Sequence, residues 1–398
     1  RSSDLVTSMA LVLGACGGGS GSASGGSASS AAADTKAESA AAESAAETKG
    51  DSSGSTSSAD DHYVMRVMHA YSTTCNHQYN MEKLAELMDE YTDGRIEVQI
   101  FPNSQLGAID KEVGMCQSGA VEAAYSINGN LETICPQEAV YTLPYFWETQ
   151  PGESTEYWAA TAPYSNIENY FRDYDADYGI YRYASINTQN GQFIAANNVR
   201  PVAVPEDLKG LKLRHSGGML ATLTLESQGA IPITMSGADV PIALEQGTID
   251  GVVSAVAHYH DTGWHTKYAT LSYNKCYSLP LIGNLAWFES LPEDLQTIVR
   301  DQVIPELSDW ANKHTSQGEL DAIDAMQEDP YNVEVTLIDQ DELNTTWAEY
   351  GNIRDDALKL YLENAGSDGV MLVEEVLKIK EDLDHDVPDI QDVLDSYR

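Results

Sequence analysis

The chain is poor in basic residues. Lys and Arg together number 22 in 398 residues, against 62 Asp and Glu, which gives a formal net charge of -40 at pH 7. A surface of this kind repels nucleic acid and anionic lipid, which excludes binding either of them through a basic face. It also repels an anionic solute, so any site for a carboxylate needs its own local positive charge.

Catalytic and metal-binding signatures are missing as well. The chain has no G-x-S-x-G or H-E-x-x-H motif, and acidic residues are too common for one pair to be singled out as a general acid and base. His258, His260 and His265 lie in the segment HYHDTGWH, but only His258 and His265 share a helical face and no acidic residue is spaced to complete a metal site. We therefore expect no enzymatic activity, no metal and no cofactor.

Cysteine is scarce and forms no recognisable pattern. There are five cysteines and no C-x-x-C pair, and the spacings do not suit metal binding by thiolates. Setting Cys16 aside, Cys75, Cys116, Cys135 and Cys276 can form two disulfides in three pairings or remain free. The sequence leaves that choice open.

The apolar run at the N-terminus is too short to span a bilayer. Residues 5–15 have the length of a signal-peptide core and end in LGAC, which resembles a bacterial lipobox. We expect residues 1–16 to be a lipoprotein signal segment that is lipidated at Cys16. Residues 17–60 are almost entirely Gly, Ser, Ala, Thr and acidic residues, which predicts a disordered linker.

The most informative stretch is residues 205–254. It predicts strands at residues 212–214, 231–235 and 249–253, separated by two helical patterns. A β-α-β-α-β order makes the three strands parallel. Arg214 then lies at the carboxyl end of its strand, where open α/β sheets bind ligands, and its guanidinium offers two parallel donors to a carboxylate.

This stretch resembles the solute-binding proteins of tripartite ATP-independent periplasmic (TRAP) transporters, of the dicarboxylate-transporter-subunit (DctP) type. Three ordered motifs carry the resemblance: DLKGLKLR at residues 207–214, GAIP at 229–232 and ALEQGTIDG at 243–251. The similarity runs over residues 63–383 and includes TDGRIEVQIFPNSQLG at 92–107, YTLPYFW at 141–147 and LPEDLQ at 291–296.

The resemblance implies an α/β, two-lobed periplasmic-binding-protein fold with a hinge, a ligand cleft between the lobes and a long helix that spans both. Residues 63–127 support it, because they repeat the β-α-β-α-β scheme. The expected boundaries are residues 61–190 and 280–318 for lobe 1, 191–279 and 319–385 for lobe 2, and 386–398 for a C-terminal tail.

The helical patterns near the C-terminus lead to two further expectations. Pro305 interrupts the long helical pattern of residues 292–327 and should kink or split that helix. Two amphipathic helices, at residues 342–362 and 369–382, are expected on the outer face of the second lobe.

By resemblance, the main carboxylate-binding residue is Arg214. Many members place a second arginine where this chain has Phe193, and an Asn or Glu where it has Ser254. The remaining candidate ligand-binding residues are His69, Asn128, Tyr145, Trp287 and Tyr259. A phenyl ring in place of the second charge predicts a monocarboxylate with an aromatic or apolar body.

We therefore expect a lipid-anchored, extracytoplasmic, monomeric solute-binding protein that delivers an organic acid to a TRAP membrane permease. Binding of a C4-dicarboxylate or a related acid is the first alternative. A receptor of an ATP-driven importer is another, and it would use stacking aromatics or peptide-backbone donors in place of a dedicated arginine. An extracytoplasmic enzyme is disfavoured because no nucleophile and base motif is present.

Overall fold

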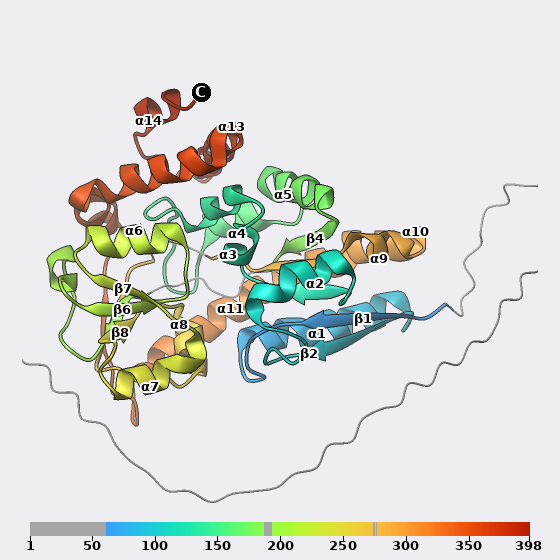
Figure 1. Cartoon of the computed structure of the whole chain (residues 1–398), viewed down its shortest axis with the longest axis horizontal. Coiled ribbons are helices and arrows are strands. Elements are labelled where there is room, and N and C mark those ends of the chain that lie inside the picture. The colour runs from blue at the N-terminus through green and yellow to red at the C-terminus, as the bar shows by residue number, and fades with distance from the viewer. Residues whose placement is uncertain (1–60, 187–192, 274, 276) are drawn as a thin grey trace, which may run out of the picture. The chain divides into compact units, whose positions relative to one another are not determined.

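The fold is built on two β-sheets, each covered by helices (Figure 1). The computed structural model describes residues 61–186, 193–273, 275 and 277–398, except for the side chain of Phe193. The residues of the proposed signal segment and linker, 1–60, lie outside this description. The α/β class predicted from the sequence is confirmed.

The first sheet has five strands in the order β2-β1-β3-β10-β4. Strand β1 pairs in parallel with β2 and β3, whereas β10 runs antiparallel to β3 and β4. Its strands are β1 (Tyr63–Met68), β2 (Ile96–Phe101), β3 (Ala123–Tyr125), β4 (Ile180–Ser185) and β10 (Pro280–Asn284). We call this sheet and the helices that pack on it the first lobe.

The second sheet has six strands in the order β11-β9-β5-β8-β6-β7. Its strands are β5 (Phe193–Asn197), β6 (Lys212–His215), β7 (Ile231–Thr234), β8 (Gly251–Val252), β9 (Tyr268–Leu271) and β11 (Glu334–Leu337). Strand β6 pairs in parallel with β7 and β8, which confirms the predicted β-α-β-α-β unit. We call this sheet and its helices the second lobe.

Gly251 explains one of the three sequence motifs. In β8 its backbone lies against β5 so closely that a Cβ atom there would be 2.3 Å from the carbonyl oxygen of Ala196. No side chain fits at that distance, so a glycine is required where the two strands meet.

The helices of the first lobe follow its strands. They are α1 (Asn76–Thr92), η1 (Ile109–Lys111), α2 (Glu112–Ser118), α3 (Asn128–Leu131), η2 (Pro136–Thr142), α4 (Thr155–Thr161), α5 (Asn166–Asp177) and α9 (Leu285–Ser290). Helix α1 buries Met81, Leu84 and Leu87 on one face and ends at Asp93, which has a left-handed backbone conformation.

The helices of the second lobe are shorter. They are η3 (Pro205–Leu208), α6 (Met219–Ser227), η4 (Gly237–Asp239), α7 (Val240–Glu245) and α8 (Val256–Asp261). Gly217 and Gly218, both with positive φ, form the turn that leads from β6 into α6. This turn therefore directly follows the strand that carries Arg214.

One long helical segment joins the cores of the two lobes. It consists of α10 (Glu293–Ile298), a π-helical turn η5 (Val299–Val303) and α11 (Ile304–Gln327). Leu295 and Leu307 pack in the core under the first sheet, whereas Met326 packs with residues of the second sheet. The predicted interruption at Pro305 is a π turn that lies just before the proline. Because proline has no backbone N–H to donate, a wider turn at this point lets the helix continue without that hydrogen bond.

The C-terminal helices differ from the expectation. Helix α13 (Ile353–Asp382) is kinked at Gly366 and follows α12 (Gln340–Glu342), a π turn η6 (Leu343–Trp347) and η7 (Tyr350–Asn352). It packs against η2, α4 and α5 of the first lobe and against α6 of the second, and not only on the second lobe (Figure 1). The expected tail contributes as well, because Ile390 and Leu394, the latter in α14 (Gln391–Asp395), are buried in the same cluster.

A buried ionic network joins η2, α5 and β4. The guanidinium of Arg182, fully buried, lies 2.5 Å from Glu138, 3.0 Å from Glu168 and 3.2 Å from Asp175, all of them buried. Burial, and to a lesser extent repulsion from the neighbouring carboxyl groups, raises the pKa of Glu138 to about 8 and that of Asp175 to about 6, although Arg182 acts to lower both.

Two sequence expectations concern cysteines and membrane spans. Cys75, Cys116 and Cys135 are buried free thiols, and Cys276 lies outside the described residues. Among the helices that the structure describes, none combines the length and the apolar character needed to cross a membrane.

Candidate ligand-binding cavity

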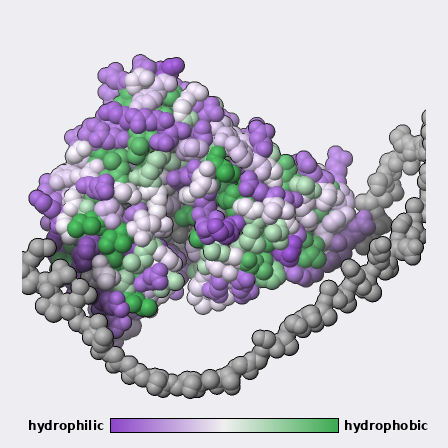
Figure 2. All heavy atoms as spheres, in the orientation of Figure 1, coloured by the Kyte–Doolittle hydropathy of each residue, from purple (hydrophilic) through white to green (hydrophobic). Residues whose placement is uncertain are grey.

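A cavity of about 1020 Å³ lies where the two lobes face each other. Figure 2 shows the surface hollowed between them. The first lobe lines it with Tyr71, Asn103, Ile127, Asn130 and Glu132. The second lobe lines it with Arg214, Met235, Ser254, His258 and Trp264. A solute in this cavity therefore contacts both lobes.

Arg214 supplies the positive charge of the cavity. It lies near the carboxyl end of β6, is 6% exposed, and donates from Nε to the carbonyl oxygen of Met235 at 2.9 Å. Its guanidinium carbon is 5.4 Å from the ring centre of Trp264, which orients the group. No ion pair of Arg214 occurs within the described residues.

The surroundings of Arg214 leave its charge uncompensated. Burial lowers the pKa of its guanidinium, because removal from water disfavours the charged form. A buried cation without a counter-ion is unfavourable. The chain has 62 acidic residues, yet none of those that the structure describes pairs with Arg214. An anionic ligand is the partner that this geometry lacks.

Aromatic rings from both lobes form one wall of the cavity. Tyr71 stacks on His77 with ring centres 3.6 Å apart, and its edge meets His258 of the second lobe at 6.0 Å. His258 in turn meets Trp264 edge-on at 5.4 Å. Burial and the nearby Arg214 lower the pKa of His258 to about 4, so its ring is neutral near pH 7. This wall suits a flat or apolar solute body.

Of the residues predicted from the sequence, Arg214 and Ser254 line the cavity. His69 is fully buried behind it, accepting a hydrogen bond from the backbone N–H of Tyr71 and contacting Gln78 at 3.0 Å. Asn128 is also fully buried and donates to the carbonyl oxygen of Glu138 at 3.4 Å. Neither His69 nor Asn128 is part of the cavity lining.

Of the predicted aromatic residues whose side chains the structure describes, Tyr145, Tyr259 and Trp287 do not line the cavity. Tyr145 is buried in the core of the second lobe and accepts a hydrogen bond from Gln228 at 2.8 Å. Tyr259 is buried with its hydroxyl 2.8 Å from that of Thr266, and Trp287 packs on the core of the first lobe from α9. The side chain of Phe193 lies outside the described residues.

Sequence reasoning missed Tyr71, Asn130 and Glu132. Each lies within a few residues of a predicted position, on the segments that follow β1 and β3. Their position in the chain could have predicted them, because loops at the carboxyl ends of parallel strands surround the ligand in open α/β sheets.

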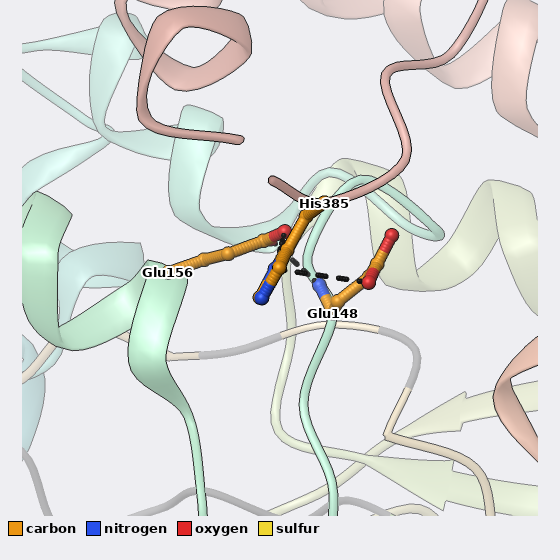
Figure 3. A group of neighbouring side chains, drawn as sticks. All are labelled: Glu148, Glu156 and His385. Atoms are coloured by element: carbon orange, nitrogen blue, oxygen red, sulfur yellow. Dashed lines mark hydrogen bonds and ion pairs between the residues drawn. The ribbon is translucent and has the colours of Figure 1, made fainter. Parts of the chain in front are cut away.

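Another group of polar residues has metal-ligand character. Glu148, Glu156 and His385 bring one ligand atom each within 4.8 Å of one another (Figure 3). The ammonium group of Lys380, however, lies 2.6 Å from Glu156 Oε1, and His385 Nδ1 lies 2.7 Å from the same atom. Lys380 therefore provides the positive charge that a metal would supply, and the group anchors the end of α13 to α4.

The structure has two lobes, each built on a sheet that contains parallel strands, and a cavity lies between them. The guanidinium of Arg214 faces this cavity without an ion-pair partner among the described residues. These features are those of a periplasmic-type solute-binding protein. The family model described as bacterial extracellular solute-binding protein, family 7 (DctP), matches residues 67–352. The chain belongs to this family, whose members are extracytoplasmic transport proteins of TRAP systems and not enzymes.

Individual relatives agree with this assignment. The chain is 27% identical over 251 residues to the C4-dicarboxylate-binding periplasmic protein DctP of Rhodobacter capsulatus, covering 62% of this chain and 72% of that one. It is 25% identical over 281 residues to the 2,3-diketo-L-gulonate-binding periplasmic protein YiaO of Escherichia coli, covering 66% and 78%.

Solved structures show the same fold. A TRAP periplasmic solute-binding protein from Desulfovibrio salexigens with bound orotic acid has a TM-score of 0.69 at 22% identity, covering 80% of this chain and 99% of that one. The sugar-acid-binding protein of Advenella mimigardefordensis in complex with galactonate has a TM-score of 0.70 at 19% identity, with coverages of 80% and 99%.

Proposed function

We propose that this protein captures an organic acid in the cavity between its lobes and delivers it to a TRAP membrane permease. The uncompensated guanidinium of Arg214 is the observation that carries the proposal. The ligands named for similar proteins support it, because C4-dicarboxylates, diketogulonate, orotic acid and galactonate all bear a carboxyl group. The protein acts as a monomer, with the permease as its protein partner.

The acid that fits this cavity best is a monocarboxylate with an aromatic or apolar body. Within the described lining, Arg214 is the only arginine or lysine, so one carboxylate has a dedicated partner. Tyr71, His258 and Trp264 offer aromatic surface beside it. The bound orotic acid of the Desulfovibrio salexigens protein is an acid of this general kind.

A thermal-shift panel tests this ligand class. We expect aryl and bulky apolar monocarboxylates to raise the melting temperature more than succinate, malate or fumarate, because the latter need a second cation. Calorimetric titration of the strongest ligands of each class measures the same preference as affinities. A larger stabilisation by a C4-dicarboxylate than by every monocarboxylate would contradict the preference, while still agreeing with acid binding.

We also propose that a lipid on Cys16 holds the protein at the outer face of the membrane. The support is the lipobox-like LGAC and the tether-like composition of residues 17–60. We expect Cys16→Ser, expressed with the complete native leader, to move the protein from the membrane fraction to the soluble extracytoplasmic fraction with an unchanged melting temperature. Equal membrane retention of the two forms would exclude this anchor.

A further inference from the structure

Polar groups of different kinds face each other across the cavity. On the second lobe, Arg214 is a donor: it uses Nε for the carbonyl oxygen of Met235 and keeps its two terminal nitrogens for a ligand. The first lobe presents Asn130 and Glu132, which follow β3 on and after α3. The hydrogen bonds that these two side chains already make decide what they offer a ligand.

Asn130 has no donor left for a ligand. Its side-chain Nδ2 donates to the carbonyl oxygen of Ile109 at 2.8 Å and to the hydroxyl of Ser126 at 3.1 Å. A carbonyl oxygen only accepts, which fixes the orientation of the amide. The two N–H groups of Asn130 are thus used, and its Oδ1 atom remains as an acceptor.

Glu132 adds a carboxyl group without a cation. Within the described residues it forms no ion pair, and its hydrogen bond comes from Asn128 Nδ2, at 3.3 Å from Oε1. Burial raises the pKa of Glu132 to about 7, and no neighbouring positive charge offsets that rise. At Asn130 and Glu132, the first-lobe wall therefore offers an acceptor and a carboxyl group that can take a further donor.

We propose that Glu132 is a specificity-determining residue: it accepts a hydrogen bond from a hydroxyl or ammonium group remote from the ligand carboxylate and rejects a second carboxylate. This inference rests on the proposed capture of an organic acid by Arg214 and deepens it. The ligand class that follows is an acid with a hydrogen-bond donor at its other end, which reaches from the second-lobe wall to the first.

Electrostatics explains why Glu132 discriminates. A second carboxylate facing Glu132 in a cavity shielded from water meets a like charge, unless the Glu132 side chain takes up a proton. A hydroxyl or an ammonium group instead supplies a donor to Asn130 Oδ1, for which the described residues provide none, and a further donor to Glu132, whose hydrogen bond comes from Asn128. Glu132 thus favours a ligand with a donor at its remote end and disfavours a dicarboxylate. Selective sites reach large affinity ratios by combining attraction of one ligand with repulsion of the other.

Two ligand series, each matched in size, test the inference. The first is succinate, gamma-hydroxybutyrate and gamma-aminobutyrate; the second is terephthalate, para-(hydroxymethyl)benzoate and para-(aminomethyl)benzoate. Calorimetry is done one pH unit above the pKa of Glu132. In the series that the wild-type protein binds better, we expect the hydroxyl or ammonium member to bind at least about tenfold more tightly than the dicarboxylate.

The isosteric variant Glu132→Gln should remove this preference by tightening the dicarboxylate about tenfold or more and weakening the ammonium member. Glu86→Gln is the matched control, because Glu86 is a first-lobe glutamate outside the cavity lining that has its own cation, with 2.9 Å between its Oε1 and Lys83 Nζ. We expect Glu86→Gln to leave the order of affinities unchanged. Melting temperatures of both variants confirm that they fold.

The outcomes separate this inference from the function on which it rests. If Glu132→Gln binds each series with the wild-type order and ratios, or if a dicarboxylate binds the wild-type protein most tightly, the role of Glu132 is wrong while acid capture stands. If neither the members of both series nor the acids of the thermal-shift panel bind the wild-type protein, acid capture itself is contradicted, and the role of Glu132 with it.

Discussion

Replacing Arg214 with alanine is expected to abolish practical binding of every acid that the wild-type protein binds. A ligand carboxylate that enters the cavity without its guanidinium partner is left desolvated and unpaired, which costs roughly 2–5 kcal/mol, or about 30-fold to several-thousand-fold in affinity. Calorimetric titration of the best ligand from the thermal-shift panel measures the loss. Near-native affinity in this variant would show that the carboxylate is bound elsewhere.

The stability of the ligand-free variant distinguishes a binding arginine from a structural one. Because Arg214 is buried without a counter-ion in the described structure, we expect Arg214→Ala to melt at the same temperature as the wild-type protein or above it. A structural ion pair predicts the opposite, since its loss would strand a buried acid. Arg300→Ala is the matched control, because Arg300 is 44% exposed, pairs with the adjacent Asp301 and does not line the cavity.

Replacing Arg182 with methionine is expected to have the largest effect on stability. The variant leaves Glu138, Glu168 and Asp175 fully buried around a site without a cation. Removing one partner of a buried ion pair costs roughly 3–5 kcal/mol. For a chain of this size, that loss lowers the melting temperature by about 4–7 °C, which calorimetry or circular dichroism detects.

Two further variants show whether charge is the cause. Combining Arg182→Met with Glu138→Gln, Glu168→Gln and Asp175→Asn should recover part of the loss, because no ionisable carboxyl group of the network is then left buried without a cation. Arg66→Met in the same sheet should change stability by only about 0–1 kcal/mol, since Arg66 is 40% exposed and pairs with Glu122 at the surface. A melting temperature for Arg182→Met close to that of the wild-type protein would contradict the stabilising role of the network.

The part of the fold that the sequence predicted best is the part fixed by local patterns. Residues 205–254 combine short apolar strands, turn glycines and helical periodicity, and the structure confirms their order and parallel pairing. That order alone places Arg214 at the carboxyl end of its strand. The position of the candidate anion site could therefore be deduced before any side-chain contact was known.

The other cavity residues could not be deduced because the direction of a side chain depends on packing between distant segments. His69 turns away from the cavity to contact Gln78 of α1, and Tyr71, two residues later, lines the cavity in its place. Tyr259 likewise points into the core of the second lobe, while His258 beside it lines the cavity. One-residue differences of this kind decide which side chain meets a ligand, and periodicity is too coarse to resolve them.

The elements on which α13 packs could not be predicted from periodicity either. An amphipathic pattern predicts that one face of a helix is buried, but it does not identify the elements that cover that face. Its apolar face covers η2, α4 and α5, which the sequence assigned to the other lobe. The contacts span most of the chain: Gln137 donates to the carbonyl oxygen of Ala365 across 228 residues, and Lys380 meets Glu156 across 224.

These long spans set the order in which the protein can fold. While the chain is being synthesised, the apolar residues of η2, α4 and α5 have no partner until α13 has also been made. Closing loops of this length is slow, so this cluster forms after synthesis and after the local β-α-β units. A polypeptide whose core is completed only by its last helices reaches its native packing only once nearly the whole chain has been made.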